Sequence, residues 1–348
     1  MSFRRKALAA TAAGACLVTT ASACSSAGSP STGASGASDK LIVLVTPNPI
    51  GVNAFLNLSV EGAKAAATAA GATLKTFEST DPTSMAQNLQ SAVDLKPELV
   101  ITVSFSFDDA MAEMPVDYPD QQFLQIDSCP EKPAANLTCA RFKEYESVYL
   151  AGVEAGLLSE KKKVGAVVAL DTPFIRRFAD PFGAGAQSVD STIGFTPLFV
   201  GGNNPFSDPA RANAQATTLG EDGADYVMAS ASAGNTGVFQ AAKAGGFYAF
   251  GVDTNQCGDE KGVVVDNAIK RLDIAIPAAV EKILGGQPGG STEYGLADGG
   301  VGLTGLQDDV ATSGCLIADH PDVIAKVKEI QAKIISGEIT VADPLTAK

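Results

Sequence analysis

From Lys40 onward, short apolar runs alternate with longer stretches in which apolar residues recur at helical spacing. Residues 41–45 are consecutive aliphatic residues, which is typical of a buried strand. An alanine-rich stretch at residues 54–70 then ends at Gly71, the residue type expected just past the end of a helix. The alternation continues through residues 74–77, 81–94, 99–103, 108–114 and 123–126.

A second cycle of the same kind begins after a helical stretch at residues 147–159. Alternating strands and helices are typical of a parallel sheet covered by helices. The two cycles therefore predict an α/β protein with two doubly wound parallel-sheet lobes. The strands and helices of the second cycle are expected at residues 164–170, 173–189, 195–200, 208–219, 226–228, 237–244 and 248–252.

Ligands of open parallel sheets bind beyond the carboxyl ends of the strands. Thr46 and Asn235 are among the polar residues that this rule selects. The selected positions also supply aromatic rings and carboxylates, a lining that suits a neutral polar ligand with a flat ring. They are residues 46–55, 104–109, 171–173, 203–208, 230–235 and 253–256.

The N-terminal part of the chain has a different composition. Basic residues precede an apolar stretch at residues 7–18, and small residues follow up to Cys24, which predicts a signal peptide over residues 1–23. Residues 24–39 are rich in Ser, Gly and Ala and predict a flexible tether. A cysteine followed by a flexible tether resembles the mature N-terminus of a lipoprotein. The protein would then be acylated at Cys24 and anchored on the extracytoplasmic face of the bacterial cell membrane. Ala21 stands where such signals usually carry Leu, so secretion without lipid is the alternative.

The charge of the chain argues against nucleic acid as a partner. Acidic residues number 39 against 25 basic residues, a formal net charge of -14 that becomes -17 when the three basic residues of the signal peptide are lost. An acidic surface of this size repels nucleic acids and anionic lipid headgroups. Beyond the signal peptide no run of about 18 apolar residues occurs, so the lipid tether is expected to hold the protein at the membrane.

Four cysteines remain outside the signal peptide and Cys24, and an even number outside the cytoplasm predicts two disulfides. Sequence alone allows three pairings. Turn-forming residues between Cys129 and Cys139 favour that pair, which leaves Cys257 for Cys315. A metal or redox site is the alternative, and it is disfavoured because there is no C-x-x-C motif and His320 is the only histidine.

The motifs of common enzymes are missing. The chain has no nucleophile elbow, P-loop lysine or HExxH motif, and residues 183–186 lack the rest of a dinucleotide-binding fingerprint. Adjacent acids such as Asp108 and Asp109 are more often solvated than catalytic. The sequence therefore predicts a binding protein rather than an enzyme, with no cofactor and no metal.

Several segments, taken together and in order, resemble the basic membrane protein family of substrate-binding lipoproteins. The family's best understood members are purine nucleoside receptors that feed ABC importers. The similarity runs from about residue 41 to residue 339. The segments are FIRRF at residues 174–178, DPA at 208–210, GVFQAAK at 237–243, GVD at 251–253, YGL at 294–296 with GGVGL at 299–303, and IISGEI at 334–339.

The resemblance implies a monomer with the type I periplasmic binding protein fold, in which the chain crosses between two lobes three times. We expect the crossings near Tyr145, Gln256 and Ser291. Lobe one would then hold residues 40–144 and 257–290, and lobe two residues 145–256 and 291–348.

The resemblance also implies the ligand-binding residues. A phenylalanine from each lobe sandwiches the purine in family members, and the matching positions are Phe55 and Phe206. Asp109 matches an aspartate that contacts the base, Asp253 lies where the ribose hydroxyls are held, and Lys270 matches a lysine that reaches the sugar. Without the resemblance, the two phenylalanines would be core residues, Asp253 a turn former and Lys270 a helix-surface lysine.

Two positions depart from the family pattern. The family usually has Asp directly after the first strand and Asn directly after the first stacking phenylalanine, where this chain has Thr46 and Leu56. A buried polar ligand group without a partner costs about 1 to 3 kcal/mol, so these departures bear on which ligand is bound. Asn48, Asn53 or Asn57 could compensate.

The resulting hypothesis is a lipid-anchored receptor that captures a purine nucleoside by closure of its lobes and delivers it to the permease subunits of an ABC importer. A surface sensor that binds another small metabolite without transport is the alternative. The sequence does not separate the two.

Overall fold

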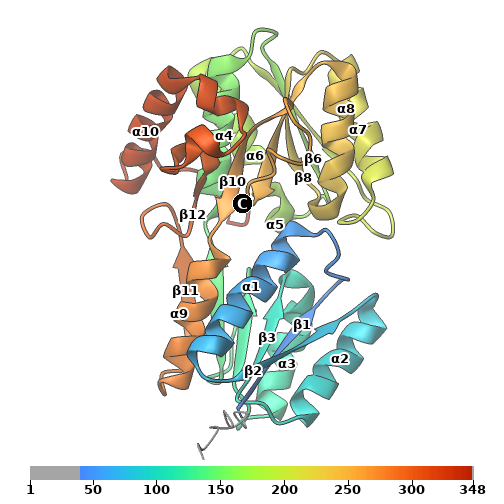
Figure 1. Ribbon diagram of the computed structural model, residues 1–348, viewed down its shortest axis with the longest axis vertical. Helices are drawn as coiled ribbons and strands as arrows, with labels where there is room; N and C mark the ends of the chain where they lie inside the picture. The colour runs from blue at the N-terminus through green and yellow to red at the C-terminus, as the bar shows by residue number, and fades with distance from the viewer. Residues whose placement is uncertain (1–39, 347–348) are drawn as a thin grey trace, which may run out of the picture. The chain divides into compact units, whose positions relative to one another are not determined.

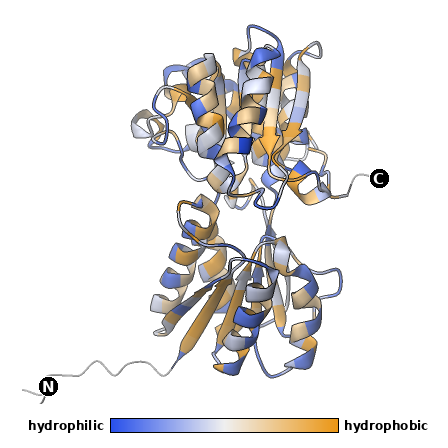
Figure 2. Ribbon diagram, turned by 90° about the vertical axis from the view of Figure 1, so that its right-hand side faces the viewer, coloured by the Kyte–Doolittle hydropathy of each residue, from blue (hydrophilic) through white to orange (hydrophobic). Residues whose placement is uncertain are grey.

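The computed structural model describes residues 40–346, so the predicted signal peptide, the tether and Cys24 lie outside the described residues. The described residues belong to one compact unit that contains two six-stranded sheets flanked by helices (Figure 1). Hydrophobic residues are concentrated in the strands of both sheets (Figure 2). The predicted α/β architecture with two doubly wound sheets is confirmed.

The first sheet has the strand order β11-β5-β4-β3-β1-β2, and all of its pairs are parallel. Its strands are β1 (Leu41–Thr46), β2 (Thr73–Glu78), β3 (Leu99–Val103), β4 (Phe123–Ile126), β5 (Leu137–Phe142) and β11 (Gly290–Tyr294). Its helices are α1 (Ala54–Ala69), α2 (Pro82–Asp94), α3 (Asp108–Asp117) and α9 (Leu272–Leu284).

The second sheet has the order β12-β10-β9-β8-β6-β7 and is parallel except for its edge strand β12. Its strands are β6 (Lys163–Val168), β7 (Gly194–Phe199), β8 (Tyr226–Ser230), β9 (Tyr248–Asp253), β10 (Val264–Lys270) and β12 (Val301–Leu303). Its helices are α4 (Glu144–Leu158), α5 (Pro173–Arg176), α6 (Asp180–Val189), α7 (Pro209–Glu221), α8 (Asn235–Gly245) and α10 (Pro321–Ile335).

The chain passes between the sheets three times, and we call the three connecting segments the hinge. They lie between β5 and α4, between β10 and α9, and between β11 and β12. The second passage is at Arg271 rather than near Gln256, and the third follows Tyr294 rather than Ser291. The predicted boundary between the lobes was wrong because β10 was not recognised as a strand. Its buried polar residues Asp266 and Asn267 interrupt the run of apolar residues that identifies a buried strand.

The helix predicted over residues 173–189 is two helices. α5 ends at Arg176, and α6 begins at Asp180 with a proline in its first turn. Proline has no N–H to donate and fits the first turn of a helix, so it favours a new start here.

Gly185 of the segment 183–186, together with Gly152, serves helix packing. A Cβ atom on Gly185 would lie 2.1 Å from the Tyr149 carbonyl oxygen, and one on Gly152 would lie 2.1 Å from the Phe182 carbonyl oxygen. Both distances are far below contact distance, so α4 and α6 can pack this closely only with glycine at these positions.

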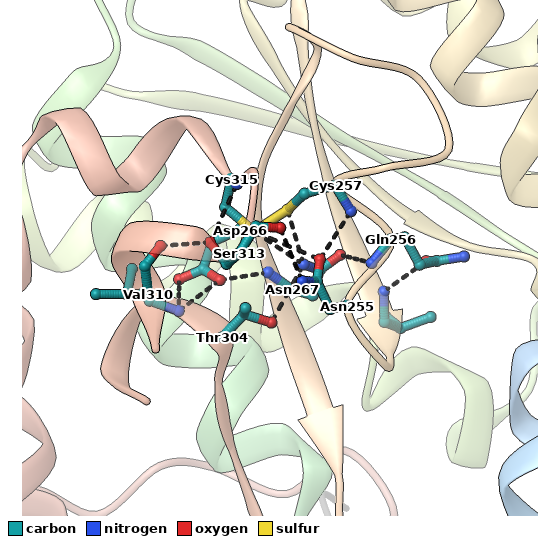
Figure 3. Close-up of a disulfide and its surroundings, with 11 residues drawn as sticks. Asn255, Gln256, Cys257, Asp266, Asn267, Thr304, Val310, Ser313 and Cys315 are labelled. Atoms are coloured by element: carbon teal, nitrogen blue, oxygen red, sulfur yellow. Dashed lines mark hydrogen bonds between the residues drawn. A yellow bond between two sulfur atoms is a disulfide. The ribbon is translucent and has the colours of Figure 1, made fainter. Parts of the chain in front are cut away.

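The described residues contain two disulfides, and both match the predicted pairs. Cys129 is bonded to Cys139, and Cys257 to Cys315. The second disulfide joins the loop after β9 to the segment before α10 (Figure 3). Within residues 40–346, no helix combines the length and apolar character needed to cross a bilayer.

Candidate functional site

A cavity lies where the carboxyl ends of strands from both sheets approach α1 and α5, which are neighbours in Figure 1. From the first sheet and α1 it is lined by Pro47, Asn48, Asn53, Phe55, Leu56, Ser104, Phe105, Ser106 and Asp127. From the second sheet and its loops it is lined by Phe174, Ile175, Phe178, Phe206, Ser230, Ser232, Asp253 and Lys270. Strand ends therefore supply most of its polar groups, as expected for parallel sheets.

Strained backbone is concentrated at this cavity. Six described non-glycine residues have a positive φ, and four of them line it: Ser104 (92°), Asp127 (81°), Ser232 (52°) and Asp253 (68°). Such conformations cost about 1 to 3 kcal/mol each and cluster at binding and active sites. In three of the four residues, the positive φ turns the backbone sharply at the end of a strand. This turn directs their side chains towards the cavity.

Aromatic rings form the apolar part of the lining. The ring centroid of Phe105 lies 5.2 Å from that of Phe174 and 6.1 Å from that of Phe206. Phe105 follows a strand of the first sheet, whereas Phe174 and Phe206 follow strands of the second. Phe55, at the start of α1, and Phe178 are buried on the side of Lys270.

A buried cation and two carboxyl groups form the polar end. The Lys270 ammonium is paired with Asp127, and it lies 4.9 Å from the ring centre of Phe178 and 5.2 Å from that of Phe55. Asp253 acts electrostatically on the same ammonium. All three charged residues are less than a tenth exposed.

Desolvation acts in opposite senses on the pKa values of the acid and the lysine at this polar end, but both pKa values are raised overall. Desolvation raises the pKa of Asp253 to about 6, although Lys270 acts to lower it. For Lys270, desolvation alone would lower the pKa, but the charges of Asp127, Glu144 and Asp253 raise it overall. The lysine therefore stays cationic and can donate, whereas Asp253 accepts hydrogen bonds above about pH 6.

Four of the residues predicted for ligand binding meet at this cavity. Phe55, Phe206, Asp253 and Lys270 all line it. Lys270 ends strand β10 and is buried, so its side chain is not on a helix surface. The structure thus brings these four residues together, and their roles in ligand binding stay a prediction.

The other three predicted ligand-binding residues do not line the cavity. Asp109 is exposed on α3. Thr46 is fully buried, and its hydroxyl donates to the Asn48 carbonyl oxygen at 2.8 Å, which stabilises the loop after β1. Asn235 accepts from the Ala231 N–H at 2.7 Å and donates to the Gln256 side chain at 3.1 Å.

The loop after β9 is held by this amide network. Gln256 accepts from the Val252 N–H, and its own N–H donates to Asn267, each at 3.1 Å (Figure 3). Cys257 follows directly and is bonded to Cys315. These contacts fix the backbone on both sides of Asp253, so Asn235 supports the site from behind rather than lining it.

Sequence reasoning missed several lining residues. Asp127 directly follows β4, so the rule that ligands bind beyond the carboxyl ends of strands could have found it. The selected positions did not include the end of this strand. Phe174 and Phe178 belong to the FIRRF segment that resembles the family, but no ligand-binding role was predicted for them. Phe105 was among the selected positions 104–109, but its contacts with rings of the second sheet are not encoded in any local pattern.

Comparison with known proteins identifies the family of this chain. The family described as ABC transporter substrate-binding protein PnrA-like matches residues 40–343. A protein of Lactococcus lactis named ABC transporter nucleoside-binding protein BmpA is 32% identical over 284 residues, covering 76% of this chain and 77% of its own. A protein of Pyrococcus furiosus named as a lipoprotein is 27% identical and covers 72% of this chain and 67% of its own.

A solved structure supports the fold. The crystal structure of an ABC transporter solute-binding protein from Aeropyrum pernix superimposes with a TM-score of 0.76 at 22% identity, covering 88% of this chain and 94% of that one. Likeness at this identity concerns the fold alone. The family match extends over nearly all of the described residues, and the chain therefore belongs to the PnrA-like family of ABC transporter substrate-binding proteins.

Proposed function

We propose that this substrate-binding protein is a lipid-anchored extracytoplasmic receptor that binds a purine nucleoside by lobe closure and delivers it to an ABC permease. One observation carries the ligand assignment. A single cavity combines phenylalanine rings from both sheets with a buried lysine and two buried carboxyl groups. A nucleoside has the same division into a flat ring and a hydroxylated sugar.

The aromatic part suits the base. A ring that enters between Phe55 and Phe206 gains stacking on both faces, worth roughly 1 to 3 kcal/mol per aromatic side chain. The rings come from α1 and from the loop after β7, so stacking on both requires the two sheets to approach each other.

The polar part suits the sugar. Asp253 and Asp127 can accept hydrogen bonds from hydroxyl groups, and Lys270 can donate one. The charged lining residues are two carboxyls and one ammonium that is already paired, so a phosphate group would meet net negative charge. This favours a nucleoside over a nucleotide.

The size of the cavity supports a mechanism of opening and closing. Its volume is about 60 Å³, well below the roughly 300–1,000 Å³ of most ligand sites. A nucleoside can enter only if the rings of Phe105, Phe174 and Phe206 separate. Lobe closure then follows because the ligand gains contacts from both sheets only in the closed state.

The test of the ligand is calorimetric titration of residues 40–348 with adenosine, guanosine, inosine, cytidine, ribose and inosine monophosphate. We expect binding of at least one purine nucleoside, and binding at least about tenfold weaker for its phosphorylated form. Heat from ribose alone, or from none of the compounds at millimolar concentration, would reject the purine assignment. Thr46 and Leu56 would then be the first residues to examine.

Anchoring is tested separately, because it rests on residues outside the described part of the chain. The full-length chain expressed with its signal peptide in a bacterium should partition into detergent, and the Cys24→Ser variant should not. The same partitioning for both chains would exclude the lipid anchor. The Pyrococcus furiosus relative named as a lipoprotein supports the expected result.

A further inference from the structure

Arg177 is a charged residue with almost no exposure, 2% of its surface, and it lies between residues that line the cavity. Ile175 precedes it by two positions and Phe178 follows it directly, and both line the cavity. The guanidinium points elsewhere, into a group of acidic side chains at the hinge. The proposed function does not use this group.

Each carboxylate around Arg177 comes from a different part of the chain. The guanidinium donates to Glu144, the first residue of α4, at 3.2 Å and lies 3.7 Å from Glu293 of β11. It also donates two hydrogen bonds to Asp343, at 2.8 and 3.2 Å. Glu144 follows the first hinge segment directly, and Glu293 shortly precedes the third.

The second hinge segment joins the same network through Glu144. Its carboxylate acts electrostatically on Lys270 as well as on Arg177, and Lys270 directly precedes the second passage. Arg177 thus contacts residues that lie next to two hinge segments, and the charge of Glu144 also acts on Lys270 at the polar end of the cavity.

Stability alone is a weak reason for such a cluster. Removing several charges from water offsets most of their mutual attraction, so buried ion pairs contribute little net stability. A planar guanidinium can instead fix several carboxylates in one geometry. Here that geometry sets the position of α5 and its aromatic residues relative to the hinge.

We propose that Arg177 is a positioning residue for ligand binding, which couples the aromatic lining of the cavity to the hinge through Glu144 and Glu293. When a ligand displaces Phe174 and Phe178, Arg177 transmits the displacement to the hinge. Asp343, which follows α10, fixes the guanidinium from the other side. This inference rests on the proposed function for its ligand but not for its hinge contacts.

The test compares Arg177→Met, Arg177→Lys and Asp343→Asn with the control Arg176→Met. Arg176 is the neighbouring arginine; its partner Asp171 is exposed to solvent, and its partner Asp180 is partly exposed. Two measurements are made on each folded variant. One is the binding of inosine, guanosine and adenosine, with association and dissociation rates. The other is the distance distribution between spin labels at Ala65→Cys on α1 and Ala214→Cys on α7, both exposed alanines.

We expect Arg177→Met to broaden the distance distribution without nucleoside and to weaken binding about tenfold, because less of the protein is in the binding-competent state. Arg177→Lys and Asp343→Asn should give smaller changes in the same direction, and Arg176→Met none. If Arg177→Met melts at a lower temperature but keeps the wild-type distances and affinity, Arg177 is only structural and the proposal is wrong.

Asp343→Asn keeps the proposal testable if Arg177→Met does not fold, and wild-type distances in Asp343→Asn would then overturn it. If the wild type binds none of the three nucleosides, the proposed function fails. The label distances without nucleoside still decide the role of Arg177.

Discussion

At the cavity, Asp127 and Asp253 share their burial with a cation, whereas Glu154 of α4 and Asp266 of β10, in the core around the second sheet, form no ion pair with any described residue. Asp266 accepts hydrogen bonds from the N–H groups of Asn267 and Gly305. Neither oxygen of Glu154 has a partner among the described residues other than the Asp266 carboxyl. We call these two groups the cavity cluster and the core pair.

The difference shows two ways to bury an acid. In the cavity cluster, the ammonium compensates negative charge, so an oxygen can stay ionised and accept from a ligand. In the core pair, burial next to another carboxyl raises the pKa of Glu154 well above its usual value. The two carboxyl groups of the core pair then have to share a proton. The protonation of the core pair therefore responds to pH, whereas the cavity cluster responds to a ligand.

Removal of the cation should have the largest effect. Lys270→Met leaves Asp127 and Asp253 buried without a counterion, which we expect to lower the free energy of unfolding by about 3 to 5 kcal/mol and to abolish nucleoside binding. Denaturant unfolding at pH 7 measures the first effect. The matched control is Lys243→Met, because Lys243 pairs with Glu260 at the surface and should cost at most about 1 kcal/mol. Equal losses in the two variants would mean that the cavity cluster is no different from a surface pair.

Truncation of the clamp rings should have the next largest effect, on binding rather than folding. Phe206 is half-buried, so Phe206→Ala should weaken nucleoside binding by about 1 to 3 kcal/mol with little change in thermal stability. Phe55 is only 9% exposed and packs in the core, so Phe55→Ala should lower both the nucleoside affinity and the thermal stability. Calorimetry and melting curves separate the two quantities.

The control for the ring truncations is Phe239→Ala. Phe239 is fully buried in α8 and does not line the cavity, so its loss should cost about 3 to 5 kcal/mol of stability. The folded fraction should keep its affinity. If Phe206→Ala resembled this control, with lost stability and unchanged affinity, Phe206 would be a core residue and the stacking proposal would fail.

The core pair predicts a pH effect of opposite sign to ordinary acid unfolding. The pKa of Glu154 is raised in the folded protein above its usual 4.5, so its contribution to stability is full below pH 4.5 and is lost as the pH rises through the raised value. Glu154→Gln mimics the protonated acid and removes this loss. The variant should therefore be more stable than wild type by about 1 to 2 kcal/mol at pH 8, and by less at pH 5.

Unfolding curves at pH 5, 6, 7 and 8 test the core pair, with Glu113→Gln on the exposed surface of α3 as control. Other buried acids titrate in both chains, so the difference between wild type and Glu154→Gln is the informative quantity. A constant difference at all four values would show that Glu154 is ionised throughout, and the core pair would not share a proton.

The same contrast explains what could be predicted from sequence. Apolar runs and helix ends sufficed for most elements of both sheets, because their burial is encoded locally. β10 was missed because Asp266 and Asn267 are buried through partners distant in sequence. Asn235 looked like a ligand contact because its position at a strand end is local information, whereas its bond to Gln256 is not.

The residues of the candidate site also differ in whether a sequence pattern or a contact distant in sequence identifies them. Phe55, Phe206, Asp253 and Lys270 were found by matching a family pattern, and they meet at one cavity. Asp127 could have been found from its strand. The ring contacts of Phe105 could not, because they depend on how two sheets built from separate parts of the chain approach each other.

Relief of backbone strain should have the smallest effect. Ser104 lines the cavity with φ 92° and ψ 149°, a conformation close to one that is essentially restricted to glycine, whereas Ser91 is in α2. Ser104→Gly should raise the free energy of unfolding by up to about 1 kcal/mol, since the relieved strain exceeds the entropy that glycine adds to the unfolded chain. The control Ser91→Gly should lower it by about 0.5 to 1 kcal/mol, because glycine is unfavourable inside a helix. Opposite signs in denaturant unfolding would support stored strain at the cavity. A loss of stability in Ser104→Gly equal to that in Ser91→Gly would show that the strand end is not strained.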